Sequence, residues 1–193
     1  MRSLCVFCGS SPGARPEYAA AARHLGTALA RRGMRLVYGG ARVGLMGLLS
    51  DAVLRAGGEV TGVIPEGVLT REVARTDLRD LRIVGTMHER KAIMAELADG
   101  FLALPGGAGT LEEFFEVWTW AQLGIHRKPC GVLNIHGYFD GLLTFLDHAV
   151  TERFLRIEHR AMVLVDADAE RLLERFEGYR APAVARWIDR NET

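Results

Sequence analysis

The stretch ALPGGAGTLEE, residues 103–113, joins a glycine-rich loop to two glutamates, Glu112 and Glu113, directly after a short apolar run. Glycines at such a place can simply turn the chain, or they can leave the backbone bare so that a ligand lies against it. Unpaired N–H groups at the start of a helix attract anions, because the helix dipole acts in the same direction. The segment therefore predicts a phosphate-binding loop with acidic side chains beside it.

Glu113 allows two interpretations. Thr110 and Glu113 have the spacing of a capping box, in which the threonine caps the helix and the glutamate reaches back to its first residue. In that case the glutamate serves the helix end alone. In the other interpretation, the carboxylate on the first turn acts on the part of the ligand next to the phosphate. Periodicity favours neither.

The segment TMHERKAIMAEL, residues 86–97, carries two basic residues within the apolar face of a predicted helix. At about 100° per residue, Met87 and Met94 share this face with Arg90 and Lys91. Snorkelling explains one basic residue in such a place, but two adjacent ones indicate an anion or carboxylate partner in a cleft. The chain has 22 arginines and only 2 lysines, so a lysine here indicates a need for a compact charge.

Two further glycine-rich loops, CGSSPG (8–13) and YGGARVGLMG (38–47), follow other apolar runs. Neither has the G-x-G-x-x-G order of a dinucleotide fingerprint, and the chain has no P-loop motif. We therefore expect a phosphate site that is specific for neither NAD nor ATP.

Two short motifs suggest a metal only weakly. Cys5 and Cys8 form a C-x-x-C, but no second pair of ligands is visible, so we interpret both as small hydrophobic residues of a strand. The His-Glu pair at 88–89 would need a histidine at position 92 to form a zinc motif, and that position is Ala92. We expect no metal and no organic cofactor.

Short apolar runs alternate with longer amphipathic segments along the chain, which predicts an α/β fold: a single-domain, doubly wound (Rossmann-like) parallel sheet with helices on both faces. Ligands of such sheets bind beyond the carboxyl ends of the strands, where the glycine loops fall. The expected strands are LCVFCG, RLVYGG, EVTGVIP, LRIVG, FLALPGG, CGVLNI and MVLVDA, and the expected helices are 15–32, 44–57, 86–99, 110–124, 138–152 and 168–178.

Length and composition agree with one domain over residues 1–193, with a core of about 3–178 and a tail of 179–193. Lys plus Arg number 24 and Asp plus Glu number 24, which argues against nucleic acid or an anionic membrane as partner. No apolar stretch approaches the roughly 20 residues that span a bilayer. The start of the chain lacks the pattern of a signal peptide, and three cysteines suit a reducing cytoplasm.

Several of these segments together resemble the motifs of a known family. PGGAGTLEE matches P-G-G-x-G-T-x-x-E, and MHERK precedes it; together with CVFCGSS, YGGARVGLMG and WAQLGIHRKP they resemble the Lonely Guy family of cytokinin-activating phosphoribohydrolases. Older labels called that family lysine decarboxylases. The resemblance covers about residues 3–178 and implies hydrolysis of the N-glycosidic bond in adenosine 5′-monophosphates, with or without an N6 substituent. The products would be the free base and ribose 5-phosphate.

The resemblance also implies roles for individual residues. It makes Arg90 and Glu113 the catalytic pair. It further implies substrate contacts by Glu72, Arg90, Lys91, Gly107, Ala108, Gly109, Thr110, Leu111, Glu112, Glu113 and Thr119. One departure is visible, because the family's usual Y-G-G-G reads Tyr38-Gly39-Gly40-Ala41 here, and alanine restricts the backbone more than glycine does.

The family is dimeric, and helix 110–124 agrees with a second copy as partner. Trp120 and Leu123 lie outside the apolar arc that the core needs, so we expect at least a homodimer. Two alternatives remain. A non-catalytic carrier of a nucleotide or molybdenum cofactor would share the glycine loops but would not need both Arg90 and Glu113. A lysine decarboxylase would need pyridoxal phosphate on one of two lysines, neither of which has a recognisable cofactor context.

Overall fold

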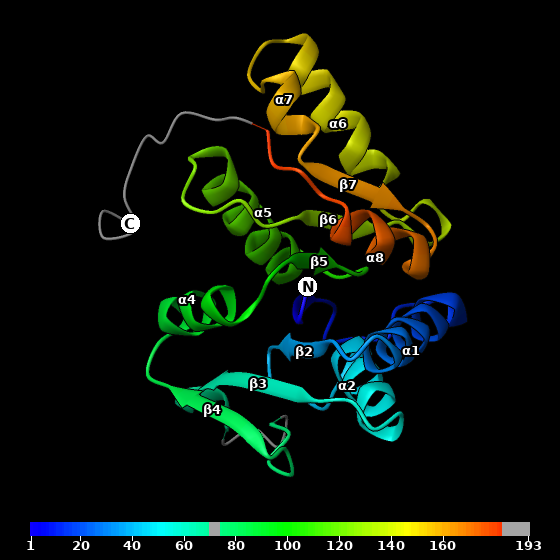
Figure 1. The fold of residues 1–193 in the computed structure, drawn as a ribbon, viewed down its shortest axis with the longest axis vertical. Coiled ribbons are helices and arrows are strands. Elements are labelled where there is room, and N and C mark those ends of the chain that lie inside the picture. The colour runs from blue at the N-terminus through cyan, green and yellow to red at the C-terminus, as the bar shows by residue number, and fades with distance from the viewer. Residues whose placement is uncertain (70–73, 183–193) are drawn as a thin grey trace.

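The computed structural model describes residues 1–69 and 74–182. Within them, seven parallel strands form one sheet in the order β4-β3-β2-β1-β5-β6-β7 (Figure 1). The doubly wound α/β fold predicted from the sequence is confirmed. The strands are β1 (Ser3–Phe7), β2 (Arg35–Tyr38), β3 (Val60–Pro65), β4 (Asp80–Val84), β5 (Phe101–Ala103), β6 (Cys130–Leu133) and β7 (Val163–Asp166).

Helices cover both faces of the sheet, with α1, α2 and α8 on one side and α4, α5 and α6 on the other (Figure 1). Their bounds are α1 (Pro16–Arg31), α2 (Gly44–Arg55), α3 (Glu66–Leu69), α4 (Met87–Leu97), α5 (Ala108–Gln122), α6 (Asp140–Thr151), α7 (Ile157–Arg160) and α8 (Ala169–Glu177), with a short 3₁₀ turn at Ile135–Gly137.

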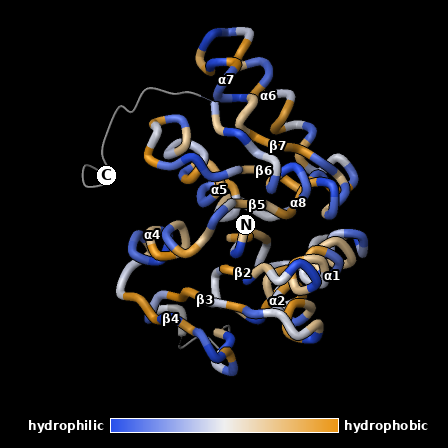
Figure 2. Tube along the Cα trace, viewed as in Figure 1, coloured by the Kyte–Doolittle hydropathy of each residue, from blue (hydrophilic) through white to orange (hydrophobic). Residues whose placement is uncertain are grey.

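Alternation along each strand divides the core between the two faces. In β1, Leu4 and Val6 pack under α1, α2 and α8, whereas Cys5 and Phe7 pack under α4, α5 and α6. All five residues of β1 are buried, as expected for a central parallel strand covered on both sides. Figure 2 shows apolar residues concentrated in the strands and on the inner sides of the helices.

Local signals fix several helix starts. Pro16 opens α1, where its missing N–H costs nothing. The Asp168 side chain caps α8 by accepting from Arg171 N. Thr86 caps α4 by accepting from Glu89 N at 3.1 Å, while the Glu89 carboxylate accepts from Gly85 N at 2.9 Å. This arrangement, close to a capping box, sets the position of the helix that carries the two basic residues.

Residues 66–80 contain the single-turn helix α3 and the start of β4. Residues 70–73 and 183–193 lie outside the described residues. Among the helices that the structure describes, none is long and apolar enough to cross a membrane.

Candidate active site

The strand order reverses between β1 and β5, which makes their carboxyl ends the topological switch point of the sheet. The loops after the two strands touch, because Gly9 N donates to the carbonyl oxygen of Pro105 at 3.0 Å. The first turn of α2, at the end of the glycine-rich segment 38–47, joins them, since Leu45 N donates to Gly9 O at 3.0 Å. The three glycine loops predicted from the sequence therefore meet at one place.

A cavity of about 420 Å³ opens at this point. It is lined by Cys8, Gly9, Ser10, Met46, Met87, Arg90, Gly107, Ala108, Gly109, Thr110, Glu112 and Glu113. A smaller hollow of about 290 Å³ adjoins it across Gly9, Ser10 and Gly107, and is walled by Tyr18 and Tyr138. The Tyr138 hydroxyl donates to Gly106 O at 2.6 Å and so supports the loop that begins α5.

The glycines before and inside α5 have different tasks. A side chain at Gly106 would collide with Thr110 Oγ1 at 2.1 Å, so this glycine is required by packing. At Gly107 and Gly109 a Cβ would meet nothing within 4 Å, so protein packing does not require these glycines. Their bare backbone faces the cavity at the start of a 15-residue helix that no side chain caps. This geometry suits an anion such as a phosphate.

Arg90 and Glu113 form a buried ion pair inside the cavity. Arg90 Nη1 lies 2.5 Å from Glu113 Oε1, and the two side chains are only 11% and 13% exposed. Arg90 comes from α4 and Glu113 from the second turn of α5, so the pair joins two helices on the same face of the sheet.

Two backbone features hold the guanidinium of Arg90 in place. Its Nε donates to the carbonyl oxygen of Val63, the fourth residue of β3, at 3.0 Å. Its Nη2 occupies the space above Gly39, where a Cβ would lie 2.2 Å away. Gly39 therefore makes room for the arginine, a role that the sequence did not reveal.

The charge state of Glu113 depends on opposing effects. Burial raises the pKa of this carboxyl above its ordinary value, and the neighbouring Arg90 opposes that rise without cancelling it. Ionised Glu113 is thus a poorly hydrated carboxylate held by one guanidinium. Perturbed carboxyl groups of this kind, in a cavity, are typical of catalytic acids and bases.

Lys91 faces another way. Its ammonium lies 2.5 Å from Glu112 Oε1 and 3.1 Å from Glu116 Oε1, and its side chain is 7% exposed. Burial tends to lower the pKa of Lys91, but the two carboxylates raise it above its ordinary value. The anionic partners expected for the two basic residues are therefore carboxylates of α5.

The capping-box interpretation of Thr110 and Glu113 is wrong. The helix begins at Ala108 with Gly107 as its N-cap, so Thr110 is the third helical residue and Glu113 lies past the first turn. Glu113 binds Arg90 instead of reaching back to the helix start. Glycine permits a helix to begin without a side-chain cap. The helix therefore begins two residues before the start predicted from the sequence.

The site residues predicted from the sequence fall into three groups according to their position relative to the cavity. Lining the cavity are Arg90, Gly107, Ala108, Gly109, Thr110, Glu112 and Glu113. Lys91, Leu111 and Thr119 do not line it, and Thr119 is exposed on the outer part of α5. Glu72 lies outside the described residues.

Ala41, the departure from the family pattern, is accommodated. The left-handed backbone of this loop falls on Gly40, with φ of +75°, and not on the alanine. Ala41 itself forms an isolated antiparallel bridge with Ala74. Cys8 and Met46 also line the cavity, and both lie in glycine-rich segments that the sequence had singled out, Met46 in the first turn of α2. Tyr138 was missed, because nothing in its surrounding sequence links it to the loop before α5.

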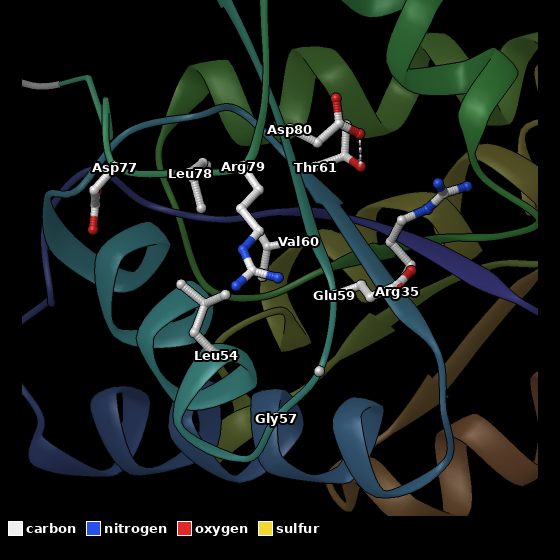
Figure 3. Close-up of a pocket in the computed structure, with 11 residues that line it drawn as sticks. Arg35, Leu54, Gly57, Glu59, Val60, Thr61, Asp77, Leu78, Arg79 and Asp80 are labelled. Atoms are coloured by element: carbon white, nitrogen blue, oxygen red, sulfur yellow. Dashed lines mark hydrogen bonds between the residues drawn. The ribbon is translucent and has the colours of Figure 1, made fainter.

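Cavity size alone would have pointed elsewhere. A larger hollow of about 630 Å³ lies at the amino ends of β2 and β3, beside residues 77–80 (Figure 3). Its walls mix arginines with acidic and apolar side chains, and it contains no glycine-lined helix start. No cluster of three or more potential metal ligands occurs in residues 1–69 and 74–182.

These features define a Rossmann-like protein with a candidate small-ligand site at the switch point of its sheet. The family model described as "possible lysine decarboxylase" matches residues 46–176. The chain is also 54% identical to a probable cytokinin riboside 5′-monophosphate phosphoribohydrolase of Oryza sativa subsp. japonica over 94% of its own length and 74% of the relative. It belongs to this family, the Lonely Guy family that the sequence resembles.

Relatives from bacteria and from plants carry the same family name. A cytokinin riboside 5′-monophosphate phosphoribohydrolase of Rhodococcoides fascians is 52% identical, with 88% of this chain and 86% of the relative covered. One of Arabidopsis thaliana is 51% identical, with 92% and 82% covered.

Solved structures support the fold. A molybdenum cofactor binding protein of Rippkaea orientalis matches with a TM-score of 0.69 at 21% identity, covering 92% of this chain and 97% of that one. The molybdenum cofactor carrier protein of Chlamydomonas reinhardtii matches with a TM-score of 0.65 at 22% identity, covering 90% and 98%. At such low identity the likeness extends to the fold alone.

Proposed function

We propose that the protein hydrolyses the N-glycosidic bond of adenosine 5′-monophosphates, with or without an N6 substituent, to the free base and ribose 5-phosphate. The observation that carries this proposal is the buried Arg90–Glu113 pair, which lines the same cavity as the uncapped start of α5. An anion site and a desolvated carboxylate side by side suit a substrate that carries a phosphate and a cleavable sugar. The names of the relatives describe this reaction for cytokinin riboside 5′-monophosphates.

In this reaction the 5′-phosphate binds at the start of α5. The backbone N–H groups of Gly107, Ala108 and Gly109 point along the helix axis toward the ligand, and the helix dipole adds to their attraction. Binding the phosphate fixes the ribose above the second turn of the helix. Such positioning can lower a reaction barrier by about 7–11 kcal/mol.

Glu113 then acts on the reacting carbon. Breaking the bond between ribose and base develops positive charge on the sugar, which a nearby carboxylate stabilises. Water adds its oxygen to the anomeric carbon, the bonding electrons leave with the base, and the proton that the water loses balances the charge on the departing base. Glu113 either stabilises the developing charge or positions this water.

Arg90 keeps Glu113 ionised and oriented. A charge-assisted hydrogen bond of 2.5 Å fixes one carboxylate oxygen and leaves the other available for the substrate or water. Val63 O and the space above Gly39 hold the guanidinium itself. We keep Glu72, Lys91, Leu111 and Thr119 as proposed substrate contacts on the family resemblance alone.

We further propose a single domain over residues 1–193 and a homodimer in the cytoplasm. Trp120 and Leu123 are half-buried on α5, and Met87 is 47% exposed at the cavity, so a second copy would cover apolar surface next to the site. The three cysteines are free and buried, which suits a reducing compartment. A monomer by light scattering at micromolar concentration would contradict the dimer.

The first experiment incubates the purified protein with AMP and with isopentenyl-AMP in the presence of EDTA. Free base and ribose 5-phosphate are followed by chromatography. We expect both products in equal amounts, and we expect Arg90→Ala and Glu113→Ala to abolish their release. Nucleotide binding without release of base would favour the carrier function instead.

A further inference from the structure

The segment that leads into β4 is fastened to the loop after β2 by its backbone. Arg75 N donates to the carbonyl oxygen of Gly40 at 2.8 Å. The residue before it, Ala74, pairs with Ala41 in an isolated antiparallel bridge. These contacts hold the loop Gly39–Ala41 from its outer side.

The side chain of Arg75 ties the same segment to α2. Its Nη1 donates to Ser50 Oγ at 3.0 Å and to the carboxylate of Asp51, and Asp77 Oδ1 lies 3.4 Å from its Nε. The Arg75 side chain is 12% exposed. Its partners Asp51 and Asp77 are 40% and 61% exposed, so the buried part of this network is the guanidinium of Arg75 itself. With these side-chain contacts added to its backbone hydrogen bond, Arg75 fixes where residues 74–77 lie.

The inner side of the same loop borders the candidate catalytic pair. Arg90 Nη2 occupies the space above Gly39, as described, and a shift of this loop would change the room left for the guanidinium. Arg75 itself does not line the cavity. Its route to the site therefore runs through the loop and Arg90 to Glu113.

We propose that Arg75 is a positioning residue: it anchors residues 74–77 to α2, holds the loop Gly39–Ala41 as a wall for Arg90, and so sets the pairing of Arg90 with Glu113. The proposal deepens the hydrolase function and rests on it for its kinetic consequences. The altered state of Glu113 can also be measured without turnover.

The test compares Arg75→Gln and Arg75→Lys with a matched control. Arg32→Gln serves as control, because Arg32 binds Glu170 at 2.7 Å with a side chain 22% exposed, between α1 and α8 on the other face of the sheet. We expect Arg75→Gln to lower kcat for AMP about tenfold with KM changed less than twofold. Arg75→Lys should recover part of the loss, and Arg32→Gln should keep kcat. All assays are run below the melting range of the least stable variant.

The state of Glu113 gives a second readout. When Arg90 is less firmly held, its opposition to the raised pKa of Glu113 weakens, so that pKa should rise further in Arg75→Gln. Carboxyl ¹³C NMR titration measures this, with Glu113→Gln to assign the signal. Glu112 and Lys91, the other charged groups near Glu113, are the same in every protein compared.

The outcomes separate the two proposals. If the wild-type protein releases no base, the hydrolase function fails, and the titration alone decides whether Arg75 positions Glu113. An unchanged Glu113 pKa in Arg75→Gln overturns the positioning role, as does a kcat loss of equal size in Arg32→Gln. A raised pKa together with a lowered kcat, both partly restored by lysine, supports it.

Discussion

Helices α4 and α5 are joined by two neighbouring ion pairs that differ in their surroundings. Arg90 and Glu113 are both nearly buried, and both line the cavity. Lys91 is as deeply buried as Arg90, but one of its partners, Glu112, is 56% exposed and the other, Glu116, is 24% exposed. The two ion pairs therefore differ in the solvent exposure of their carboxylates, whereas their basic side chains are buried to a similar extent.

The exposure of the carboxylate indicates which of the two ion pairs is suited to catalysis. A carboxylate that water reaches gains little reactivity from its cationic partner, and such pairs mainly hold helices together. A carboxylate that is removed from water has a raised pKa, and its ionised form interacts more strongly with a nearby positive charge. We therefore expect substitutions in the Arg90–Glu113 pair to change activity, and substitutions in the Lys91 pair to change stability.

The largest effect is expected for Glu113→Gln. This variant keeps the shape of the side chain but removes its charge, so kcat should fall by about 10²–10⁴-fold. AMP affinity should change little, because the phosphate site at Gly107 is untouched. Single-turnover kinetics and calorimetry measure the two quantities. Glu116→Gln is the matched control, because Glu116 pairs with Lys91 at 3.1 Å and does not line the cavity, and it should keep kcat within severalfold. Turnover like wild type in Glu113→Gln would remove the distinction between the pairs.

Gly39→Ala should separate activity from folding. The added methyl group would displace the Arg90 guanidinium, which is the end of a flexible side chain, so the melting temperature should stay within about 2 °C. Misplacing a catalytic group by about 1 Å can cost on the order of 10²-fold in rate, and we expect kcat/KM to fall by about that much.

Gly47→Ala is the contrasting control for this substitution. Its Cβ would lie 2.0 Å from the backbone oxygen of Arg42, so the main loss should be in stability. Thermal unfolding and steady-state kinetics on both variants make the comparison. A Gly39→Ala protein with normal kcat/KM would show that Arg90 need not lie against this glycine.

The pH dependence follows from the buried acid. Burial raises the pKa of Glu113 despite Arg90. In the proposed mechanism the ionised form of Glu113 is the active one. Below that pKa, kcat/KM should therefore fall about tenfold per pH unit, and above it kcat/KM should level off. Stability from this group has the opposite trend: it is present below the unfolded pKa and lost as pH rises through the folded one. A pH–rate profile whose acid limb lies at or below the ordinary glutamate pKa would contradict the assignment.

Lys91→Met should give the smallest change in rate. Removing the ammonium leaves Glu112 and Glu116 facing each other without a cation, so unfolding free energy should drop by about 1–3 kcal/mol, less than for a fully buried pair. We expect kcat to stay within about threefold. The substrate contact that the family resemblance proposes for Lys91 would appear as a rise in KM, whereas a tenfold loss of kcat would contradict the distinction between the pairs.

The fold was largely predictable from the sequence, because the central parallel strands are buried on both faces. Each such strand is therefore a run of apolar residues, and several of these runs end in glycine. The two basic residues of α4 also stood out, since charge within an apolar face needs a partner. The identity of that partner did not follow from the sequence, because Glu113 meets Arg90 only through the packing of α4 beside α5.

Other details depend on backbone geometry that side-chain patterns do not encode. The start of α5 at Ala108 follows a glycine that caps the helix without any side-chain signal. The place of Gly39 against Arg90 depends on where the loop after β2 lies in space. Alanine was tolerated at position 41 because the left-handed residue is Gly40.

Helix α5 carries both the anion site and the acid on one rigid rod. Ala108 and Glu113 are five residues apart, which corresponds to about 7–8 Å along a helix axis. If the proposed function holds, this spacing sets the distance between the phosphate of a bound nucleotide and the bond to be cut. Because no hinge separates the two ends, the protein cannot adjust one without moving the other, and the length of the substrate between phosphate and base is measured by the helix itself.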